Sequence, residues 1–336
     1  MKRTALAVLA AAMATAMPAQ KRIAAAGSHT FDSYEGTEQK DTMTFSYNDD
    51  GKLLGYTGST EMTEDDMPIN MKVDGTYEWN GTSTLTSTTS ASASVLGMKF
   101  SATVTSVFAI ENGRATAVDV SMKGNMGMSG SATITYTYDA DGKIAEAKYN
   151  GKDAQLTAKC TWEDGNIARI EYSDGETRTF VTNYKYTDLP TPAGWIGNAA
   201  LPFSSSDDNV DSGWAMFGYS ELFGTQCKNL PASCVTTENG ETQGSETFRY
   251  NIDADGYPVA SVTTTLDADG EEEEVAYDYY TWTGTPLSAI NSAKATANTA
   301  EIDAIYSVSG ARLQHLQKGV NILRMNDGTT RKVIMK

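Results

Sequence analysis

Acidic residues followed by glycine are the part of this sequence that could most readily do chemistry. Residues 139–142 read Asp-Ala-Asp-Gly between two runs of alternating residues, and similar acidic stretches precede Gly51, Gly256 and Gly270. Carboxylates so spaced could ligate calcium, act as a catalytic acid pair, or begin a chain reversal. Each interpretation requires particular residues nearby, and the sequence shows whether those residues are present.

The calcium reading requires a bidentate glutamate at the twelfth position of an EF-hand loop, with glycine at the sixth. Placing Gly142 sixth puts Lys148 twelfth, and placing Gly256 sixth puts Val262 twelfth. The frames set on Gly51 and Gly270 also lack the glutamate. The sequence therefore predicts no metal site of this type. A weaker cation site, formed by oxygens that converge from several turns, stays open.

The catalytic reading requires two carboxylates that face each other across a substrate, with the pKa of one raised by burial. Asp139 and Asp141 lie at a hairpin tip, where both are solvated. A turn explains them better, because aspartate caps a type I turn and glycine adopts the left-handed conformation that closes it. We expect turns at these positions and no catalytic residues.

The cysteines and histidines do not form a nucleophilic site. A cysteine catalyst needs a histidine partner, and the only histidines, His29 and His315, are near opposite ends of the chain. Cys160 is expected in the core. Cys227 and Cys234 flank an Asn-Leu-Pro segment, and in an exported chain they are either a local disulfide or a pair of small buried thiols.

Repeated hairpins organise most of the chain. Alternating strands that end in tyrosine or another aromatic residue precede an acidic turn, as in residues 44–56, 136–149 and 248–262. Successive turn glycines are separated by 30, 32, 29 and 23 residues, at Gly51, Gly81, Gly113, Gly142 and Gly165. One hairpin per repeat predicts an all-β antiparallel meander over residues 28–285.

Residues 82–134 are rich in Ser, Thr, Ala, Met and Gly, and they alternate frequently. Threonine suits a pleated, half-wet face, so an extended sheet with one polar face is expected, and a flat threonine ladder used for binding is the alternative. An outer-membrane barrel alternates in the same way. The acidic middle region, the small polar residues on both faces and the carboxyl-terminal architecture favour the meander.

An aromatic insertion interrupts the repeats. Residues 213–225 are expected to form a short amphipathic helix after a polar stretch, with Asn-Leu-Pro at its exit. It either plugs one end or face of the curved sheet or, with Trp195, Trp214 and Tyr219, forms a ligand-binding platform. No other group of residues is a stronger candidate for ligand binding.

The first 19 residues have the layout of a secretory signal peptide. Lys2 and Arg3 precede an apolar run, and Ala19 offers a small residue for cleavage. No transmembrane segment is expected in the mature chain. The formal net charge is -17, and residues 23–301 have 16 basic against 41 acidic residues. Such a surface repels phosphate backbones, which argues against nucleic acid as a partner.

Two segments resemble known families. The YTYDADGK hairpin, the ELFGTQCKNLP segment and the FRYNIDADGYPVASV hairpin together resemble an uncharacterised family of secreted and lipoprotein-like Bacteroidetes proteins with hairpins similar to YD repeats. The match covers roughly residues 130–285 and implies fold and location only. Lipid-anchored members have a cysteine after the signal peptide, which this chain lacks.

Residues 302–336 are similar to the carboxyl-terminal sorting domain of the type IX secretion system. The matching features are IYSVSG, KGVNILRM and a basic strand that ends at Lys336. The resemblance implies secretion machinery as a partner. The segment itself predicts four short strands in a small β-sandwich, after a linker at residues 286–301; an ordinary terminal β-domain is the alternative.

The sequence thus predicts a non-enzymatic protein that is secreted or on the cell surface, reached through the periplasm. We expect an extracellular binding module for a glycan, a peptide or a host surface, with no cofactor. A secreted hydrolase with carboxylate catalysis is the alternative from another class, and Glu163, Asp164 and Glu171 are the acids available to it. A purely structural or adhesive component is a third reading.

Overall fold

The structure is a computed structural model. It describes residues 21–32, 37–49, 51–64, 67–95, 98–152, 154–175, 178–195, 200–203, 220–283, 302–307, 310–313, 317, 319–325 and 330–335. The expected signal peptide (1–19) and linker (286–301) lie outside these residues. No helix in the described part of the chain is long and apolar enough to cross a membrane.

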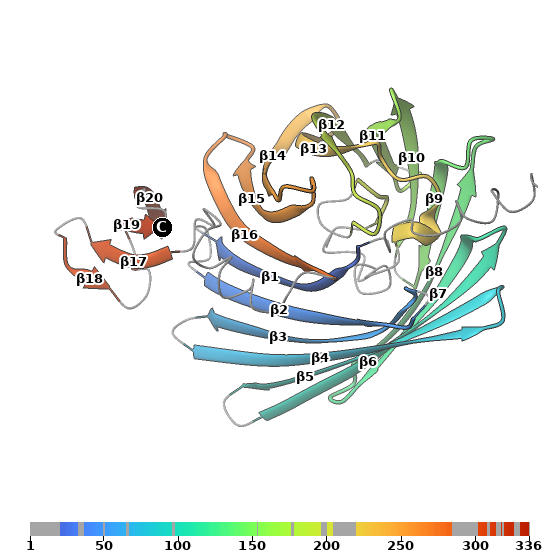
Figure 1. Cartoon of the computed structure of the whole chain (residues 1–336), viewed down its shortest axis with the longest axis horizontal. Helices are drawn as coiled ribbons and strands as arrows, with labels where there is room; N and C mark the ends of the chain where they lie inside the picture. Colours follow the sequence, from blue (N-terminus) through green and yellow to red (C-terminus); the bar gives the residue numbers. More distant parts are fainter. Residues whose placement is uncertain are drawn as a thin grey trace, which may run out of the picture.

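Sixteen antiparallel strands form a closed barrel in which each strand pairs with its sequence neighbours (Figure 1). The strands are β1 (Ile23–Asp32), β2 (Thr37–Tyr47), β3 (Leu53–Glu64), β4 (Met67–Asn80), β5 (Thr84–Val95), β6 (Met98–Glu111), β7 (Arg114–Gly124), β8 (Ser129–Tyr138), β9 (Ile144–Gly151), β10 (Gln155–Glu163), β11 (Asn166–Ser173), β12 (Thr179–Pro190), β13 (Asn229–Glu238), β14 (Glu241–Ile252), β15 (Pro258–Asp267) and β16 (Glu272–Trp282). The all-β antiparallel prediction is confirmed.

The prediction of an open meander is wrong, because the first and last strands pair with each other. The β1–β16 ladder runs from Ile23 opposite Trp282 to Asp32 opposite Glu274. At one end of this seam the backbones of Arg22 and Thr283 continue the pairing, with Thr283 N donating to Arg22 O at 2.7 Å. Closure satisfies the backbone groups that two free edges would leave unpaired.

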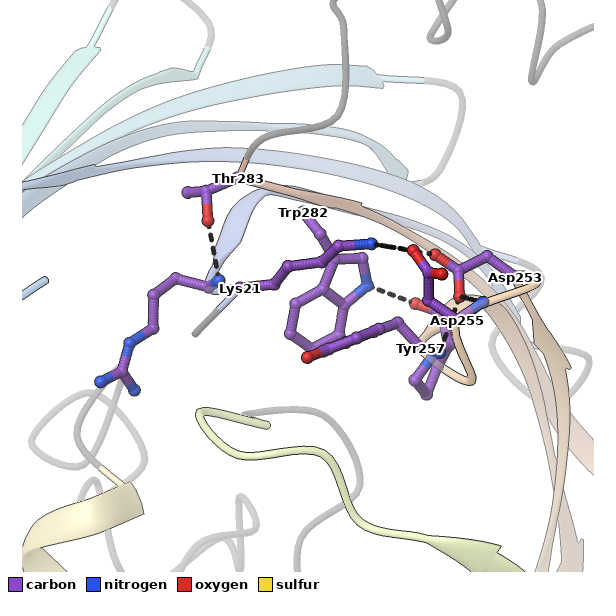
Figure 2. A network of polar contacts seen from close by, with 8 residues as sticks. Lys21, Asp253, Asp255, Tyr257, Trp282 and Thr283 are labelled. Atoms are coloured by element: carbon purple, nitrogen blue, oxygen red, sulfur yellow. Dashed lines mark hydrogen bonds and ion pairs between the residues drawn. The ribbon is translucent and has the colours of Figure 1, made fainter. Parts of the chain in front are cut away.

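A polar network fastens the same end of the seam (Figure 2). Lys21 Nζ lies 2.6 Å from Asp255 Oδ2 and 3.7 Å from Asp253 Oδ2, and it lies over the ring of Tyr257. The indole of Trp282 donates to Pro258 O at 2.7 Å. The β14–β15 turn is therefore tied to the start of β1 and the end of β16.

The repeated acidic turns are confirmed as turns, and all but the one at Gly270 lie at a single end of the barrel. Asp139 Oδ1 accepts hydrogen bonds from the backbone N–H groups of Asp141 and Lys143, each at 2.9 Å, and Gly142 has a φ of +79°. Since neighbouring strands are antiparallel, a hairpin repeat returns its turn to the same end after every second strand. We call this end the plug end and the opposite one the far end.

The two faces of the wall differ in polarity. On β4, Val73, Gly75 and Tyr77 are buried and face inward, while Lys72 and the alternate residues after it, including Asp74, Thr76 and Glu78, are exposed. On β5, Leu85, Ser87 and Thr89 are buried, whereas Ser90 is exposed. The half-wet threonine sheet expected from the sequence is present. Charged residues lie on its outer face, whereas on β5 serine and threonine occupy positions on both faces.

Aromatic residues of the segment between β12 and β13 fill the plug end from inside. Phe203 packs against Tyr149 and Tyr172, with ring centroids 6.1 and 5.6 Å away. Phe223, 1% exposed, lies 5.0 Å from Tyr136 by the same measure. We call the described residues of this segment, 191–195, 200–203 and 220–228, the plug.

Backbone contacts tie the plug to the turns. Thr225 N donates to Gly142 O at 2.9 Å, and Lys228 N donates to Gly165 O at 3.0 Å. Gly224 has a φ of +81°, and a Cβ there would lie 2.3 Å from Gly142 O. Only glycine fits this close approach.

The predicted helix at residues 213–225 is wrong for the part that the structure describes. Ser220–Phe223 form a single 3₁₀ turn, η1, and residues 213–219 lie outside the described residues. An end-filling role for the insertion, one of the two alternatives, agrees with the burial of Phe223 and Leu222.

The carboxyl-terminal strands form one sheet, so the predicted sandwich is also wrong. The order is β18 (Arg312–Leu313), β17 (Ile302–Ser307), β19 (Gly319–Met325) and β20 (Thr330–Met335). Buried Asn321 uses its amide to bond both the N–H and the C=O of Gln317, at 2.9 and 2.6 Å. This unit is too small to supply the second layer that a sandwich requires.

The plug should contribute strongly to stability. Replacing Phe223 with alanine removes a fully buried ring, so we expect the free energy of unfolding to fall by about 3–5 kcal/mol. Urea denaturation followed by tryptophan fluorescence measures this loss. Met126→Ala, at a side chain that is 70% exposed, is the control and should change it by less than about 0.5 kcal/mol. Equal small losses would show that the ring does not pack as described.

Candidate functional site

Trp195, the described member of the aromatic platform proposed from sequence, lies in the core. Its indole is 2% exposed and packs on Trp282, Tyr280 and Tyr250, with ring centroids 6.3, 4.7 and 6.3 Å away. In this position its ring is covered by the barrel wall and is not presented to solvent. Trp214 and Tyr219 lie outside the described residues, so the platform stays a prediction for them.

The three cysteines are free thiols, so the local disulfide between Cys227 and Cys234 is not formed. Cys227 Sγ accepts from Ile167 N and contacts Tyr186 Oη, both at 3.4 Å, whereas Cys234 Sγ donates to Glu246 Oε2 at 3.3 Å. The two side chains are thus held by different neighbouring strands. Burial raises the pKa of Cys160 to about 12, which leaves its thiol protonated and unreactive.

The acids available to a hydrolase do not form a facing pair. Glu163 and Asp164 are exposed at the β10–β11 turn, and Glu171 forms an ion pair with Arg169 on the outer wall. Asp139 caps its turn, as described above. Within the described residues, no group of three or more metal-ligating side chains is placed to hold an ion.

A set of carboxylates on the inner wall was not found from the sequence. The first row lies near the far end, where Asp32 of β1 is opposite Glu274 of β16, Glu274 is opposite Thr265 of β15, and Thr265 is opposite Glu246 of β14. These residues face inward because β16 alternates, so that Glu274 and Asp278 share a face with the core residues Tyr280 and Trp282.

A second row lies closer to the plug. Asp41 of β2 is opposite Ser28 of β1, and Ser28 is opposite Asp278 of β16. Asp41 accepts hydrogen bonds from Gln39 Nε2 at 2.8 Å and Thr60 Oγ1 at 2.6 Å. Ser261 Oγ donates to Asp278 Oδ2 at 2.9 Å. We call the five residues of both rows the acidic wall: Asp32, Asp41, Glu246, Glu274 and Asp278.

Burial shifts two members of the acidic wall, Glu274 and Asp278, toward protonation. Burial, followed by the charges of Asp32 and Glu246, raises the pKa of Glu274 to about 7. Burial also raises the pKa of Asp278, although hydrogen bonds from Ser28 and Ser261 oppose this shift. Glu274 is therefore only partly ionised at neutral pH.

Apolar side chains line the inner face on other strands. Met43 of β2, Met71 of β4, Ala91 of β5 and Val120 of β7 are partly buried and pack against the core. The inner wall is thus divided between an acidic sector on β14–β2 and an apolar sector on β2–β7. A ligand with both a cationic and an apolar part would match this division.

A compact charged cluster lies on the outer wall, on β1 and β2. Glu38 Oε1 lies 2.7 Å from His29 Nε2 and 2.9 Å from Lys40 Nζ. The hydrogen bond with His29, followed by that with Lys40, lowers the pKa of Glu38 to about 2 against the cost of burial. The His29 ring packs on Phe31 at 4.2 Å between centroids. With no nucleophile among these contacts, the cluster is an ion-pair network.

Comparison with known proteins supports the barrel architecture. Residues 118–260 match a family model described as a domain of unknown function (DUF4595) with porin-like fold. A crystal structure of a porin-like protein from Bacteroides uniformis superimposes with a TM-score of 0.53 and 15% identity, covering 77% of this chain and 96% of that chain. One from Bacteroides vulgatus gives 0.48 and 13%, covering 79% of this chain and 100% of that chain. No curated protein sequence matches the chain.

A faint signal for the acidic wall was present in the sequence. In KDTMTF, Asp41 alternates with Met43 and Phe45, and in YDYYTW, Asp278 alternates with Tyr280 and Trp282. An acid in phase with core residues faces inward. Which acids become neighbours, however, depends on strand register, which these short stretches do not specify.

The Glu38 cluster predicts a defined acid sensitivity. Because the folded-state pKa of Glu38 is about 2, below its unfolded value, its stabilisation is present above about pH 4.5 and is lost as pH falls toward 2. Glu38→Gln should lower the free energy of unfolding at pH 7 by about 1–2 kcal/mol, after allowance for partial exposure. Urea denaturation from pH 7 to pH 2 measures this, and the difference from wild type should vanish at the acid end. The exposed Glu61→Gln is the control; a constant difference across pH would contradict the assignment.

Proposed function

We propose that this protein is an exported, non-enzymatic surface protein whose barrel is a water-facing binding module. The observation that carries the proposal is the polar, charged outer face of the wall, together with the plug that fills one end. Export is supported by the signal-peptide pattern and by the similarity of the tail to a sorting domain.

The outer wall lacks the composition that lipid requires. A transmembrane barrel has an outward apolar band about 25 Å tall, and a lysine or arginine in the middle of it costs about 2–4 kcal/mol. Here exposed charged residues occur along the outer face of many strands: Glu61, Lys72, Asp74, Glu78, Lys99, Lys148, Lys159, Arg169 and Lys185. On β5, the outward-facing residues are all serine or threonine.

The plug argues against free diffusion through the barrel. Phe223, Phe203 and Trp195 are each under 5% exposed and contact side chains of the surrounding wall. A general pore needs a polar, water-filled interior. A filled plug end leaves recognition, rather than conduction, as the use of the inner wall.

Among the ligands expected from the sequence, a peptide with basic and apolar side chains suits the inner wall best. The acidic wall supplies the complementary charge, and the methionines on β2 and β4 supply a polarizable apolar surface that adapts to different shapes. A structural or adhesive role is the second candidate, favoured by the outward-facing row of serine and threonine residues on β5.

The water-facing barrel predicts behaviour in solution. Residues 21–283, produced without the tail, should purify without detergent as a monodisperse species, because the outer wall is polar. They should also stay at the bottom of a flotation gradient with liposomes of neutral and anionic lipid. Detergent-dependent solubility, or flotation with both kinds of liposome, would contradict the proposal.

The ligand class can be tested by titration. An amphipathic lysine- and leucine-containing peptide should bind in isothermal titration calorimetry, and Asp41→Asn should weaken it by about tenfold, the effect of losing one partner of a charge pair. Asp74→Asn, on the exposed face of β4, is the matched control and should leave the affinity unchanged. Equal binding by both variants would place the peptide on the outer wall instead.

A further inference from the structure

Two neighbouring hairpin tips at the far end of the barrel expose methionine side chains. Met98 begins β6 and is 51% exposed, and Met126 lies in the β7–β8 turn and is 70% exposed. Single exposed apolar residues are common on protein surfaces. The backbone conformation and the surroundings of these two side chains therefore decide whether they have a use.

The backbone of Met126 adopts a conformation that rarely holds a methionine. Its φ is +57°, and that of Gly127 is +85°. Met128 N donates to Asn125 O at 3.3 Å, and Gly124 N donates to Met128 O at 2.8 Å, as in a two-residue hairpin turn of type I′. Asparagine, aspartate and glycine are favoured at both central positions of such a turn because they tolerate positive φ. The turn is thus strained in order to expose a large apolar side chain at its tip.

Asn125 holds the two tips together. Its Nδ2 donates to Lys99 O at 2.7 Å, and its Oδ1 accepts from Ser101 N at 3.0 Å. Its own N–H donates to Ser101 O at 3.0 Å. Met98 and Met126 are each adjacent in sequence to a residue of this bridge. Side chains presented on a preorganised support lose less conformational freedom on binding than side chains on independent loops.

The same tips are basic in a chain whose formal net charge is -17. Residues 82–110 and 120–138 contain one lysine each, Lys99 and Lys123, and no acidic residue. Both lysines are exposed, and neither forms an ion pair with another residue that the structure describes. Asp119 of β7, an acid closer to the middle of the wall, accepts a hydrogen bond from Thr133 Oγ1 at 2.7 Å. The two tips therefore form a surface that is both apolar and cationic.

We propose that Met98, Lys99, Lys123 and Met126 form a docking surface for an acidic polypeptide segment that carries an apolar side chain. The lysines complement its carboxylates, and the polarizable thioethers adapt to the shape of its apolar group. Lipid fits this surface less well, because the outward-facing residues of β5 behind the tips are serine and threonine, so the apolar area ends at the tips. The charge preference is opposite to that of the acidic wall, so the surface does not depend on the ligand proposed there.

Fluorescence anisotropy with labelled peptides tests this on the full chain at low ionic strength. A short peptide of glutamates with leucines at its centre should bind. A peptide of glutamates alone should bind about tenfold more weakly, because it leaves the methionines uncovered. Added salt should weaken the binding of both peptides, because it screens contacts between exposed charges.

Met126→Asn separates binding from folding. Asparagine is favoured at this position of the turn, so the variant should be at least as stable as wild type in urea denaturation. It should nevertheless bind the glutamate–leucine peptide about tenfold more weakly, because the apolar contact is lost. Val107→Ala truncates an apolar side chain that is 37% exposed on β6, and this matched control should bind as wild type does.

The charges are tested by replacing both Lys99 and Lys123 with glutamine. This variant should bind the peptide more weakly and with less dependence on salt, whereas Lys72→Gln, on the exposed face of β4, should behave as wild type.

Failure of the wild type to bind the glutamate–leucine peptide, or equal binding by Met126→Asn, would overturn the proposal. A loss of stability in Met126→Asn would show that the methionine supports the fold instead. Self-association in sedimentation velocity that Met126→Asn abolishes would assign the tips to a second copy of the chain. Flotation with anionic vesicles that the same variant abolishes would assign them to lipid. Each of these last three results would also overturn the proposal.

Discussion

The pairing of β1 with β16 is the constraint on which the rest of the structure depends. It closes sixteen strands into one ring, and a ring of this size encloses more space than the side chains of its own wall can fill. In porins that space is an aqueous channel, and the wall is polar inside and apolar outside. Here most core residues face inward, and most charged residues outside the acidic wall face outward, so another segment of the chain fills part of the enclosed space. Trp195, Phe203 and Phe223 of the plug provide it at one end.

The filling makes the two ends of the barrel unlike. At the plug end, short turns, backbone hydrogen bonds to residues 224–228 and the Lys21 network hold the wall together. Toward the far end the inner wall becomes acidic on one side and apolar on the other. Burial disfavours the charged forms of Glu274 and Asp278 and raises the pKa of each. The proposed ligand-binding surface therefore lies toward the far end, whereas the contacts of the plug and the Lys21 network lie at the other end.

Local features were readable from the sequence, and long-range ones were not. The acidic turns, the hairpin repeat and the antiparallel strands follow from residues that are neighbours in the chain. Closure depends on strand pairing between residues 23–32 and 274–282, which no local sequence pattern predicts. The acidic wall could not be predicted for the same reason, because Asp32, Glu274 and Glu246 become neighbours only through the register of the paired strands. The sequence left open whether Trp195 is buried or forms part of a ligand-binding platform, because a row of aromatic residues does not by itself show which part of the protein covers it.

The orientation of the wall is the central claim, and cysteine labelling tests it most directly. Ser87 and Ser90 lie on β5; Ser87 is 2% exposed and faces inward, and Ser90 is exposed and faces outward. With a water-soluble maleimide and no detergent, Ser90→Cys should label rapidly, while Ser87→Cys should stay near the background of the three native thiols. The opposite order, or shielding of Ser90→Cys by detergent or lipid, would show a lipid-facing barrel with a wet interior and contradict this account.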